Sequence, residues 1–353
     1  MPEHSRVIRV LVVDDSAFVR KVVAQMLSRS PFIEVVGTAR DGEEALDLVA
    51  RLDPDVVTLD LMMPSMTGVE FLRKQMSTRP VPVVICSIAH ESGAMAIDAF
   101  DAGAVEFVQK PTALATERIF DITDDLVSKV KAASLVRMSN VRTTNGTMME
   151  RSPVATAVLE PVQHRADVVV LGISTGGPQA LRLVIPRLPA SFPVPVVMVL
   201  HMPVGYTEMY AQRLNDISSL EVVEARDGDL MRPGVAFLAP AGRHLSFRRQ
   251  TDGTVRVHLD VRPIDTPHRP SVDVMFRSAA EVFDGRVLGV VMTGMGNDGL
   301  LGAAHIKARG GRILTEAEES CVVYGMPRAI VEASLSDRTA PLGEMAEALT
   351  EMI

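Results

Sequence analysis

A single serine lies among glycines directly after an apolar run, in the sequence Gly-Ile-Ser-Thr-Gly at 172–176. The run at 168–171 predicts a buried parallel strand, and Pro178 predicts the first turn of a helix. Ser174 is therefore expected on a strand-to-helix turn, where small neighbours expose a hydroxyl beside the amide groups of the helix start. Such a turn can carry a nucleophile, but it can also bind phosphate or simply pack.

Two further strand ends carry residues that could assist a serine nucleophile. The predicted strand at 194–200 ends at His201, and the strand at 287–293 runs into Gly-Met-Gly-Asn-Asp-Gly, which contains Asp298. The carboxyl ends of parallel strands meet at one edge of a sheet. A histidine there can serve as general base, and an aspartate can orient it and stabilise the imidazolium, although most histidines at strand ends have no catalytic role. Together the three strand ends favour hydrolysis by a serine, a histidine and an aspartate.

The glycine-rich segment at 294–299 also supports an alternative function. It satisfies the Gly-x-Gly-x-x-Gly pattern of a dinucleotide site, and Glu316 or Glu318 follows at about the required distance of 20 residues. Against this interpretation, Asp298 would repel a pyrophosphate, and the serine and histidine at the neighbouring strand ends would have no role. A nucleotide-binding or non-enzymatic output module that uses this loop remains the alternative to a hydrolase.

The first part of the chain also places polar side chains at strand ends. Asp14 and Asp15 follow the predicted strand at 9–13, Asp60 follows 55–59, Ser87 follows 82–86 and Lys110 follows 105–108. Three carboxylates at one edge of a sheet repel one another unless a divalent cation neutralises them, so the pattern predicts a magnesium site. A carboxylate in such a site can also accept a phosphoryl group, whose charge a metal ion and a lysine would neutralise.

Strands alternate with helices throughout, which predicts two doubly wound, mainly parallel α/β domains. Residues 1–133 contain five strand–helix units. Residues 166–353 repeat the pattern and add an antiparallel hairpin around Asp252-Gly253, for which we expect a type I′ turn. Residues 134–165, in which Ser, Thr, Asn and Pro interrupt the periodicity, are expected to form an interdomain linker.

Composition excludes several other classes of protein. The formal net charge is −8, which disfavours nucleic acid as a partner. Apolar residues make up 47% of the sequence, yet no stretch of about 18 apolar residues occurs, so we expect no membrane insertion. Cys86 and Cys321 lie in different predicted domains and are expected to be reduced thiols. We therefore predict a cytoplasmic protein, and expect it to be a monomer.

Residues 1–133 resemble the receiver domains of two-component response regulators. The matching segments are DDS at 14–16, LDLMMPSMTG at 59–68, CS at 86–87, Phe107 and KP at 110–111. The resemblance implies a flavodoxin-like domain in which Asp60 accepts a phosphoryl group from a histidine kinase. It also implies the remaining roles: Asp14 and Asp15 hold Mg²⁺ with Asp60, Lys110 contacts the phosphoryl group, and Ser87 and Phe107 change position on phosphorylation.

Residues 166–353 resemble the catalytic domain of the chemotaxis protein-glutamate methylesterases, the CheB family. The segments that carry the resemblance are GISTGGPQAL, HMPVGYTEMYAQRLN, GVAFLAPAGRHL, HRPSVDVMF, VVMTGMGNDG and SCVVYGMPRAI. The resemblance implies a Rossmann-like domain in which Ser174 is the nucleophile, His201 the base, Asp298 its orienting partner, and Thr175 and Met295 lie near the oxyanion. It implies no cofactor for the esterase site.

The same resemblance implies the substrate. Methylated glutamates on chemotaxis receptors would be demethylated with release of methanol, and receptor glutamines would be deamidated. We further expect the unphosphorylated receiver to shield Ser174, and phosphorylation of Asp60 to relieve this inhibition.

Overall fold

The structure is a computed structural model that describes residues 6–87, 93–110, 118–141 and 166–353. The chain forms two compact units, Met1–Thr147 and Met148–Ile353. Most of the predicted linker, residues 142–165, lies outside the described residues.

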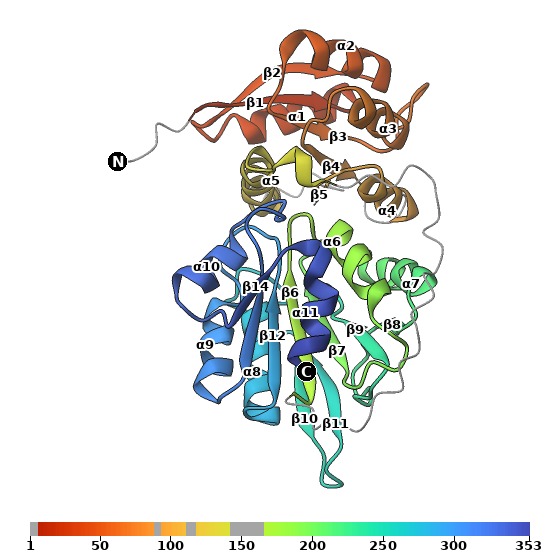
Figure 1. The fold of residues 1–353 in the computed structure, drawn as a ribbon. Coiled ribbons are helices and arrows are strands. Elements are labelled where there is room, and N and C mark those ends of the chain that lie inside the picture. Colours follow the sequence, from red (N-terminus) through yellow and green to blue (C-terminus); the bar gives the residue numbers. More distant parts are fainter. Residues whose placement is uncertain (1–5, 88–92, 111–117, 142–165) are drawn as a thin grey trace. The chain divides into compact units, whose positions relative to one another are not determined.

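The first unit is a parallel sheet with connecting helices (Figure 1). Its strands have the order β2-β1-β3-β4-β5, and every neighbouring pair is parallel. In chain order its elements are β1 (Ile8–Val13), α1 (Ala17–Leu27), β2 (Ile33–Ala39), α2 (Gly42–Leu52), β3 (Val56–Leu59), α3 (Gly68–Thr78), β4 (Val83–Ser87), α4 (Gly93–Asp101), β5 (Glu106–Gln109) and α5 (Arg118–Ser134), followed by a 3₁₀ turn at Met138–Asn140.

The topology of this sheet predicts a functional site at one edge. The chain runs from β1 outward to β2 and returns to the other side of β1 as β3, so the strand order reverses between β1 and β3. Ligands of doubly wound sheets bind at the carboxyl ends of the strands beside such a reversal. Asp14 directly follows β1 and Asp60 directly follows β3, which brings both carboxylates to this position.

The second unit contains a larger parallel sheet and a separate antiparallel pair. Its main sheet has the order β14-β13-β12-β6-β7-β9-β8 and is parallel throughout, whereas β10 and β11 form an antiparallel hairpin. The strands are β6 (Val168–Ile173), β7 (Val196–Leu200), β8 (Glu221–Glu224), β9 (Val235–Leu238), β10 (His244–Arg249), β11 (Val255–Asp260), β12 (Val287–Val291), β13 (Arg312–Glu316) and β14 (Arg338–Ala340). The helices are α6 (Gly177–Val184), α7 (Thr207–Ile217), α8 (Val272–Phe283), α9 (Leu300–Ala308), α10 (Met326–Glu332) and α11 (Met345–Met352), with 3₁₀ turns at Ile185–Arg187 and Leu342–Glu344.

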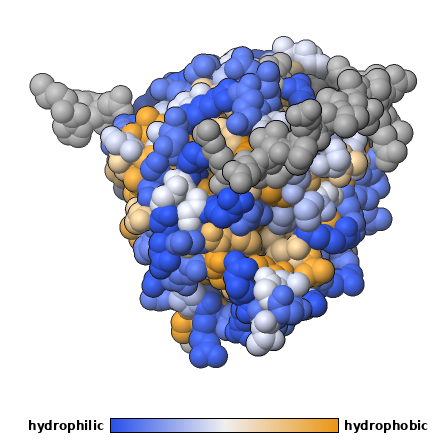
Figure 2. Space-filling view, turned by 60° about the horizontal axis from the view of Figure 1, so that its bottom comes forward, coloured by the Kyte–Doolittle hydropathy of each residue, from blue (hydrophilic) through white to orange (hydrophobic). Residues whose placement is uncertain are grey.

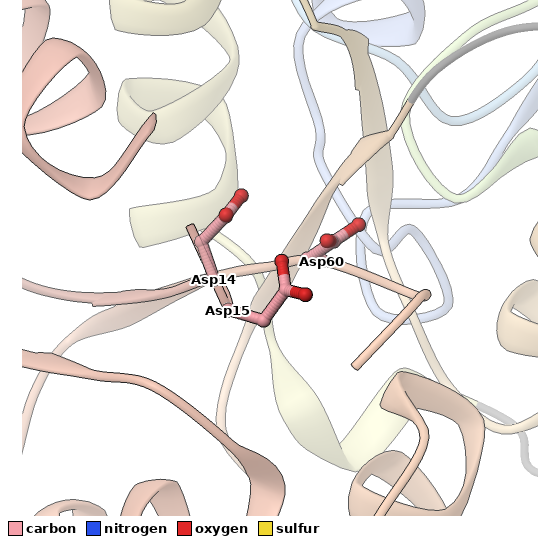
Figure 3. Close-up of side chains that lie close together, drawn as sticks. All are labelled: Asp14, Asp15 and Asp60. Carbon is pink, nitrogen blue, oxygen red and sulfur yellow. The ribbon is translucent and has the colours of Figure 1, made fainter. Parts of the chain in front are cut away.

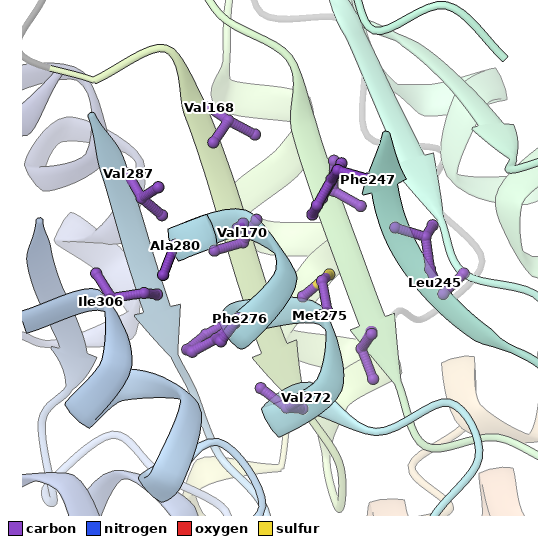
Figure 4. Packing of buried hydrophobic residues seen from close by; sticks show 14 of the residues in the cluster. Val168, Val170, Leu245, Phe247, Val272, Met275, Phe276, Ala280, Val287 and Ile306 are labelled. Carbon is purple, nitrogen blue, oxygen red and sulfur yellow. The ribbon is translucent and has the colours of Figure 1, made fainter. Parts of the chain in front are cut away.

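Helix α8 packs across the centre of this sheet and forms much of the core (Figure 4). Its buried Met275 and Phe276 belong to the same apolar cluster as Val170 of β6. The first residue of the helix approaches β6 so closely that a Cβ on Gly172 would lie 2.4 Å from Val272 Cγ1. The glycine therefore allows the N-terminus of α8 to reach the end of the strand that precedes Ser174.

The fold class predicted from the sequence is confirmed: both units are doubly wound parallel α/β structures, and the second carries the antiparallel hairpin. The predicted type I′ turn is wrong. That turn requires positive φ at both central residues, but of Asp252 and Gly253 only the glycine has it, at 85°. Gln250 N–H donates to Thr254 O at 2.7 Å, so the strands are joined by a longer loop that needs one left-handed residue.

Hydrophilic residues cover much of the face shown in Figure 2, with apolar residues exposed between them. Scattered apolar surface of this kind is ordinary for folded proteins. Within the described ranges, no helix is both long enough and apolar enough to span a membrane.

Candidate active site and phosphoacceptor site

Three adjacent strands, β12, β6 and β7, bring the predicted catalytic residues to one edge of the larger sheet. Ser174 directly follows β6 and His201 directly follows β7. The His201 N–H donates to Ile173 O at 3.2 Å, and the Ser174 N–H donates to Thr293 O, beyond the end of β12, at 3.0 Å. Backbone hydrogen bonds therefore fix the serine between the two neighbouring strand ends.

His201 and Asp298 form a direct pair. The His201 Nε2 lies 2.9 Å from Asp298 Oδ2, and each side chain is 10% exposed. The other ring nitrogen, Nδ1, is buried and has no hydrogen-bond partner within the described part of the chain. The ring therefore has one nitrogen bound to a carboxylate and one available for a proton transfer.

The N-terminus of α8 holds the Asp298 carboxylate. This carboxylate accepts hydrogen bonds from Ser271 Oγ at 2.9 Å, Val272 N at 2.8 Å and Asp273 N at 3.0 Å. Burial alone would raise the pKa of Asp298, but the hydrogen bonds from His201 and the α8 amides lower it to about 2. An ionised Asp298 can only accept, so Nε2 of His201 carries the proton of this pair and Nδ1 is the basic nitrogen.

A second aspartate completes the arrangement around α8. Asp273, in the first turn of α8, accepts hydrogen bonds from Gly299 N at 3.0 Å and Gly302 N at 2.7 Å, at the start of α9. Asp298, just before α9, thus binds amides at the start of α8, and Asp273, in α8, binds amides at the start of α9. Neither Ser271 nor Asp273 is among the residues predicted for the site, although Ser-x-Asp at a helix start is a recognisable capping signal.

Glycine at position 294 permits the close contact between the glycine-rich loop and the turn that carries Ser174, the predicted nucleophile turn at 173–176. A Cβ there would lie 2.8 Å from Ser174 Cβ and 2.5 Å from Met326 Sδ. Thr175, which follows Ser174, is buried, and Met295, which follows Gly294, is half-buried. The structure therefore places both predicted oxyanion residues on segments that flank the serine, and their role stays a prediction.

Glu316 is in the wrong place for the dinucleotide alternative. This residue, at the end of β13, is 0% exposed, and its Oε2 accepts a hydrogen bond from Thr293 N at 2.9 Å. A carboxylate buried in this way cannot bind the ribose of a nucleotide. The glycine-rich loop also has another use, since its Asp298 holds His201. The nucleotide-binding function is therefore not favoured.

The buried Glu316 predicts a pH-dependent stability. Burial raises its pKa to about 7, against the hydrogen bonds from Thr293 and Ser320, so the folded chain binds a proton that the unfolded chain has released. Its contribution is full below the unfolded pKa of about 4.5 and is lost as pH rises through about 7. We expect Glu316→Gln to remove about 3 kcal/mol of this pH dependence between pH 4.5 and 8.

Urea unfolding of the wild-type protein and Glu316→Gln at several pH values would measure this effect. Parallel stability curves for the two proteins would contradict the prediction. Glu318→Gln, at an exposed position on the following loop, is the matched control and should leave the pH dependence unchanged.

The first unit brings three carboxylates together at the ends of β1 and β3 (Figure 3). Ligand atoms of Asp14, Asp15 and Asp60 all lie within 4.8 Å of one another. Lys110 Nζ lies 2.6 Å from Asp14 Oδ2 and 2.7 Å from Asp60 Oδ2. Burial raises the pKa of Asp60, and Asp14 adds to this effect while Lys110 opposes it. An all-carboxylate donor set with a neighbouring lysine fits a hard divalent cation.

The other residues predicted for this site lie on or just after β4 and β5, the two strands that follow β3 in the sheet. Ser87 ends β4 and Phe107 lies in β5; each is 2% exposed. The Lys110 N–H donates to Ser87 O at 2.9 Å, which ties the lysine backbone to the end of β4. All six residues predicted for phosphoryl chemistry are thus described, although the following segments, 88–92 and 111–117, lie outside the described residues.

A serine, a histidine and an aspartate at adjacent strand ends are typical of a hydrolase, and the carboxylate cluster with its lysine is typical of a receiver domain. The comparisons agree with both classes. Residues 169–349 match the CheB methylesterase family model, and residues 10–121 match the response regulator receiver domain. The chain belongs to the CheB methylesterase family.

Similar proteins extend over almost the whole chain. A Myxococcus xanthus protein-glutamate methylesterase/protein-glutamine glutaminase is 50% identical over 340 residues, 96% of each chain. A protein of the same name from Halalkalibacterium halodurans is 42% identical over 344 residues, 97% of each. The crystal structure of the Thermotoga maritima CheB methylesterase catalytic domain is 41% identical, with a TM-score of 0.52, and covers 53% of this chain and 99% of its own.

Proposed function

We propose that this chain is a receiver-controlled hydrolase that removes methyl groups from glutamate γ-methyl esters of chemotaxis receptors and deamidates receptor glutamines. The observation that carries this function is the His201–Asp298 pair, held by the N-terminus of α8 at a strand end next to that of Ser174. Full-length similarity to proteins named protein-glutamate methylesterase/protein-glutamine glutaminase supports the substrate class.

In the proposed reaction, these residues carry out every step of acyl transfer. The Oγ of Ser174 attacks the γ-carbonyl carbon of the ester while Nδ1 of His201 takes the hydroxyl proton. Thr175 and Met295 flank the oxyanion that forms. The tetrahedral intermediate collapses, and the imidazolium, stabilised by the Asp298 carboxylate, gives its proton to the departing methoxide, which leaves as methanol.

Water then completes the cycle. His201 takes a proton from the water as its oxygen attacks the acyl-enzyme, and returns that proton to Ser174 when the free glutamate leaves. With a glutamine side chain the leaving group is ammonia and the product is again glutamate, so one site serves both reactions. Apart from the attacking water, every group that acts on the substrate in this sequence is a side chain or backbone group of the protein, and no cofactor is assigned to the esterase site.

The receiver supplies the control. Asp60 would accept a phosphoryl group from a chemotaxis sensor histidine kinase, and Lys110, close to Asp60 already, would bind that group. Asp14 and Asp15 with Asp60 would hold Mg²⁺, which neutralises charge during phosphoryl transfer. Ser87 and Phe107 would change position in response. We propose that the protein acts as a monomer in the cytoplasm, together with this kinase and the receptors.

Methanol release from methylated receptor membranes tests the proposed function. We expect the wild-type protein to release methanol, and a small-molecule phosphodonor with Mg²⁺ to raise the rate about 5- to 150-fold, the range of a coupling energy of about 1–3 kcal/mol. Asp60→Asn should keep the basal rate and lose the activation, because the carboxamide cannot accept the phosphoryl group.

A fragment of residues 166–353 is the control for this experiment, since it lacks the receiver and should not respond to the phosphodonor. Activation of Asp60→Asn to the wild-type level would refute control through Asp60. Unphosphorylated full-length enzyme as active as the fragment would refute inhibition by the receiver.

A further inference from the structure

We infer that Glu316 is a positioning residue for the nucleophile turn and acts on it through the backbone of Thr293. This inference rests on the proposed role of Ser174 as nucleophile. It concerns a buried acid on β13 that the proposed mechanism does not use, and that the sequence alone connected only with nucleotide binding.

Thr293 connects the nucleophile turn to its surroundings through hydrogen bonds of its backbone and its hydroxyl group. Its C=O accepts from Ser174 N at 3.0 Å, and its Oγ1 can donate to Thr175 O at 3.0 Å or to Val323 O at 3.3 Å. Its Oγ1 also accepts from Val323 N at 3.0 Å, and its own N–H donates to Glu316 Oε2 at 2.9 Å. One 1%-exposed residue thus contacts both the serine and the residue after it. The Glu316 carboxyl is the acceptor that fixes the backbone N–H of Thr293.

This chain of bonds runs directly toward the reacting atom. The N–H of Thr293 donates to Glu316, and the C=O of Thr293, which belongs to the next peptide group, accepts from the Ser174 N–H. Removal of the acceptor would leave a buried N–H unsatisfied, and the Met292–Thr293 peptide group would turn toward another partner, which changes the backbone angles of Thr293 and so the direction of its C=O. Such a rotation would displace the serine without altering the surface that binds substrate.

The partners of Glu316 allow it to work in either protonation state. As a carboxylate, its Oε1 accepts from Ser320 Oγ at 3.0 Å. As an acid, it can donate to Ser320 Oγ, whose hydrogen can then turn to Ala317 O at 3.2 Å. Oε2 remains the acceptor for Thr293 in both states. The raised pKa of about 7 supports the presence of both forms near neutral pH.

Among the described groups, burial and hydrogen bonds rather than a neighbouring charge set the protonation equilibrium of Glu316. Burial raises the pKa of Glu316, and hydrogen bonds from Thr293, Ser320 and Cys321 lower it. Cys321 on the adjoining loop is buried, with its Sγ 3.9 Å from Glu316 O, whereas the acids of that loop, Glu318 and Glu319, are exposed. The hydrogen bonds rather than a salt bridge therefore define the role of Glu316.

Three substitutions separate this role from charge and from bulk. Glu316→Gln keeps an oxygen for Thr293 N–H and should retain kcat for methanol release to within about threefold. Glu316→Asp keeps the charge but withdraws the oxygen by one methylene, and Glu316→Ala removes it. Both should lower kcat about tenfold or more, with an unchanged KM. A tenfold loss corresponds to about 1.4 kcal/mol, which is the size of one lost hydrogen bond.

A kcat of Glu316→Gln as low as that of Glu316→Ala would overturn the inference. So would full kcat in folded Glu316→Asp or Glu316→Ala, or an effect on KM alone. If the shorter variants fail to fold, NMR of the wild-type protein decides: the Thr293 and Ser174 amide signals should titrate together with a midpoint near pH 7. A Ser174 signal that does not follow Thr293 would overturn the inference. Ser174→Ala, measured in parallel, would keep full activity only if the proposed function itself were wrong.

Discussion

Ser174→Ala is expected to lower kcat for methanol release by about 10⁶-fold, the size of effect found when the nucleophile of a serine hydrolase is removed. The substitution deletes the one oxygen that would form the acyl-enzyme, while the backbone bond from residue 174 to Thr293 O remains possible. The folded structure should therefore persist, and methylated receptors should still bind. Methanol release under saturating substrate, together with a binding measurement, separates the two effects.

Ser246→Ala is the matched control for this variant. It makes the same substitution on the β10–β11 hairpin, where the hydroxyl donates to His258 O at 3.2 Å, and should leave kcat unchanged. A Ser174→Ala protein that still turns over methylated receptors at the wild-type rate would rule out the acyl-enzyme at this residue.

Asp298→Asn is expected to lower kcat by about 10⁴-fold, the loss seen when the aspartate of such a triad becomes an amide. The carboxamide can donate to Nε2 of His201, which moves the ring proton to Nδ1, the nitrogen that must accept the proton of Ser174. The amide also fits the α8 terminus poorly, because both oxygens of Asp298 now accept hydrogen bonds there. The imidazole would thus be held in the wrong tautomer.

Asp273→Asn separates catalysis from helix capping. Asp273 accepts hydrogen bonds of the same kind from the start of α9, but in the described part of the chain the ring of His201 pairs with Asp298 and not with Asp273. We expect this control to lose stability in urea while its kcat stays within about tenfold of the wild-type value. Equal losses of kcat in the two variants would show that Asp298 acts only as a cap. Heteronuclear NMR of the His201 ring would report the change of tautomer directly.

The sequence indicated the strand ends of the esterase site but not the contacts that hold it. Ser174, His201 and Asp298 could be proposed because each follows a strongly apolar strand, and parallel strands share one carboxyl edge. That α8 binds the Asp298 carboxylate could not be foreseen, since residue 272 reaches residue 298 only after the sheet and its helices have packed. Long-range packing decides such contacts, and periodicity does not report it.

Smaller errors have equally local causes. The three-residue strand β14 is too short to show any periodicity and was not distinguished from the loops around it. Asp252-Gly253 correctly predicts the place of the hairpin, but it does not form the predicted two-residue turn, because only Gly253 adopts the left-handed conformation. Glu316 was considered for nucleotide binding because a strand-end carboxylate does not reveal from sequence that it is fully buried.

Asp298 and Asp273 hold the starts of α8 and α9 together, so these two positions of the enzyme cannot vary independently. Asp298 lies just before α9 and serves the amides of α8, and Asp273 lies in α8 and serves those of α9. Neither position can change alone without leaving buried amides of the other helix unsatisfied. In a double-mutant cycle the two residues should therefore be non-additive. The orientation of His201 therefore depends on how the starts of α8 and α9 are held together, and substitutions at these two aspartates are constrained as a pair.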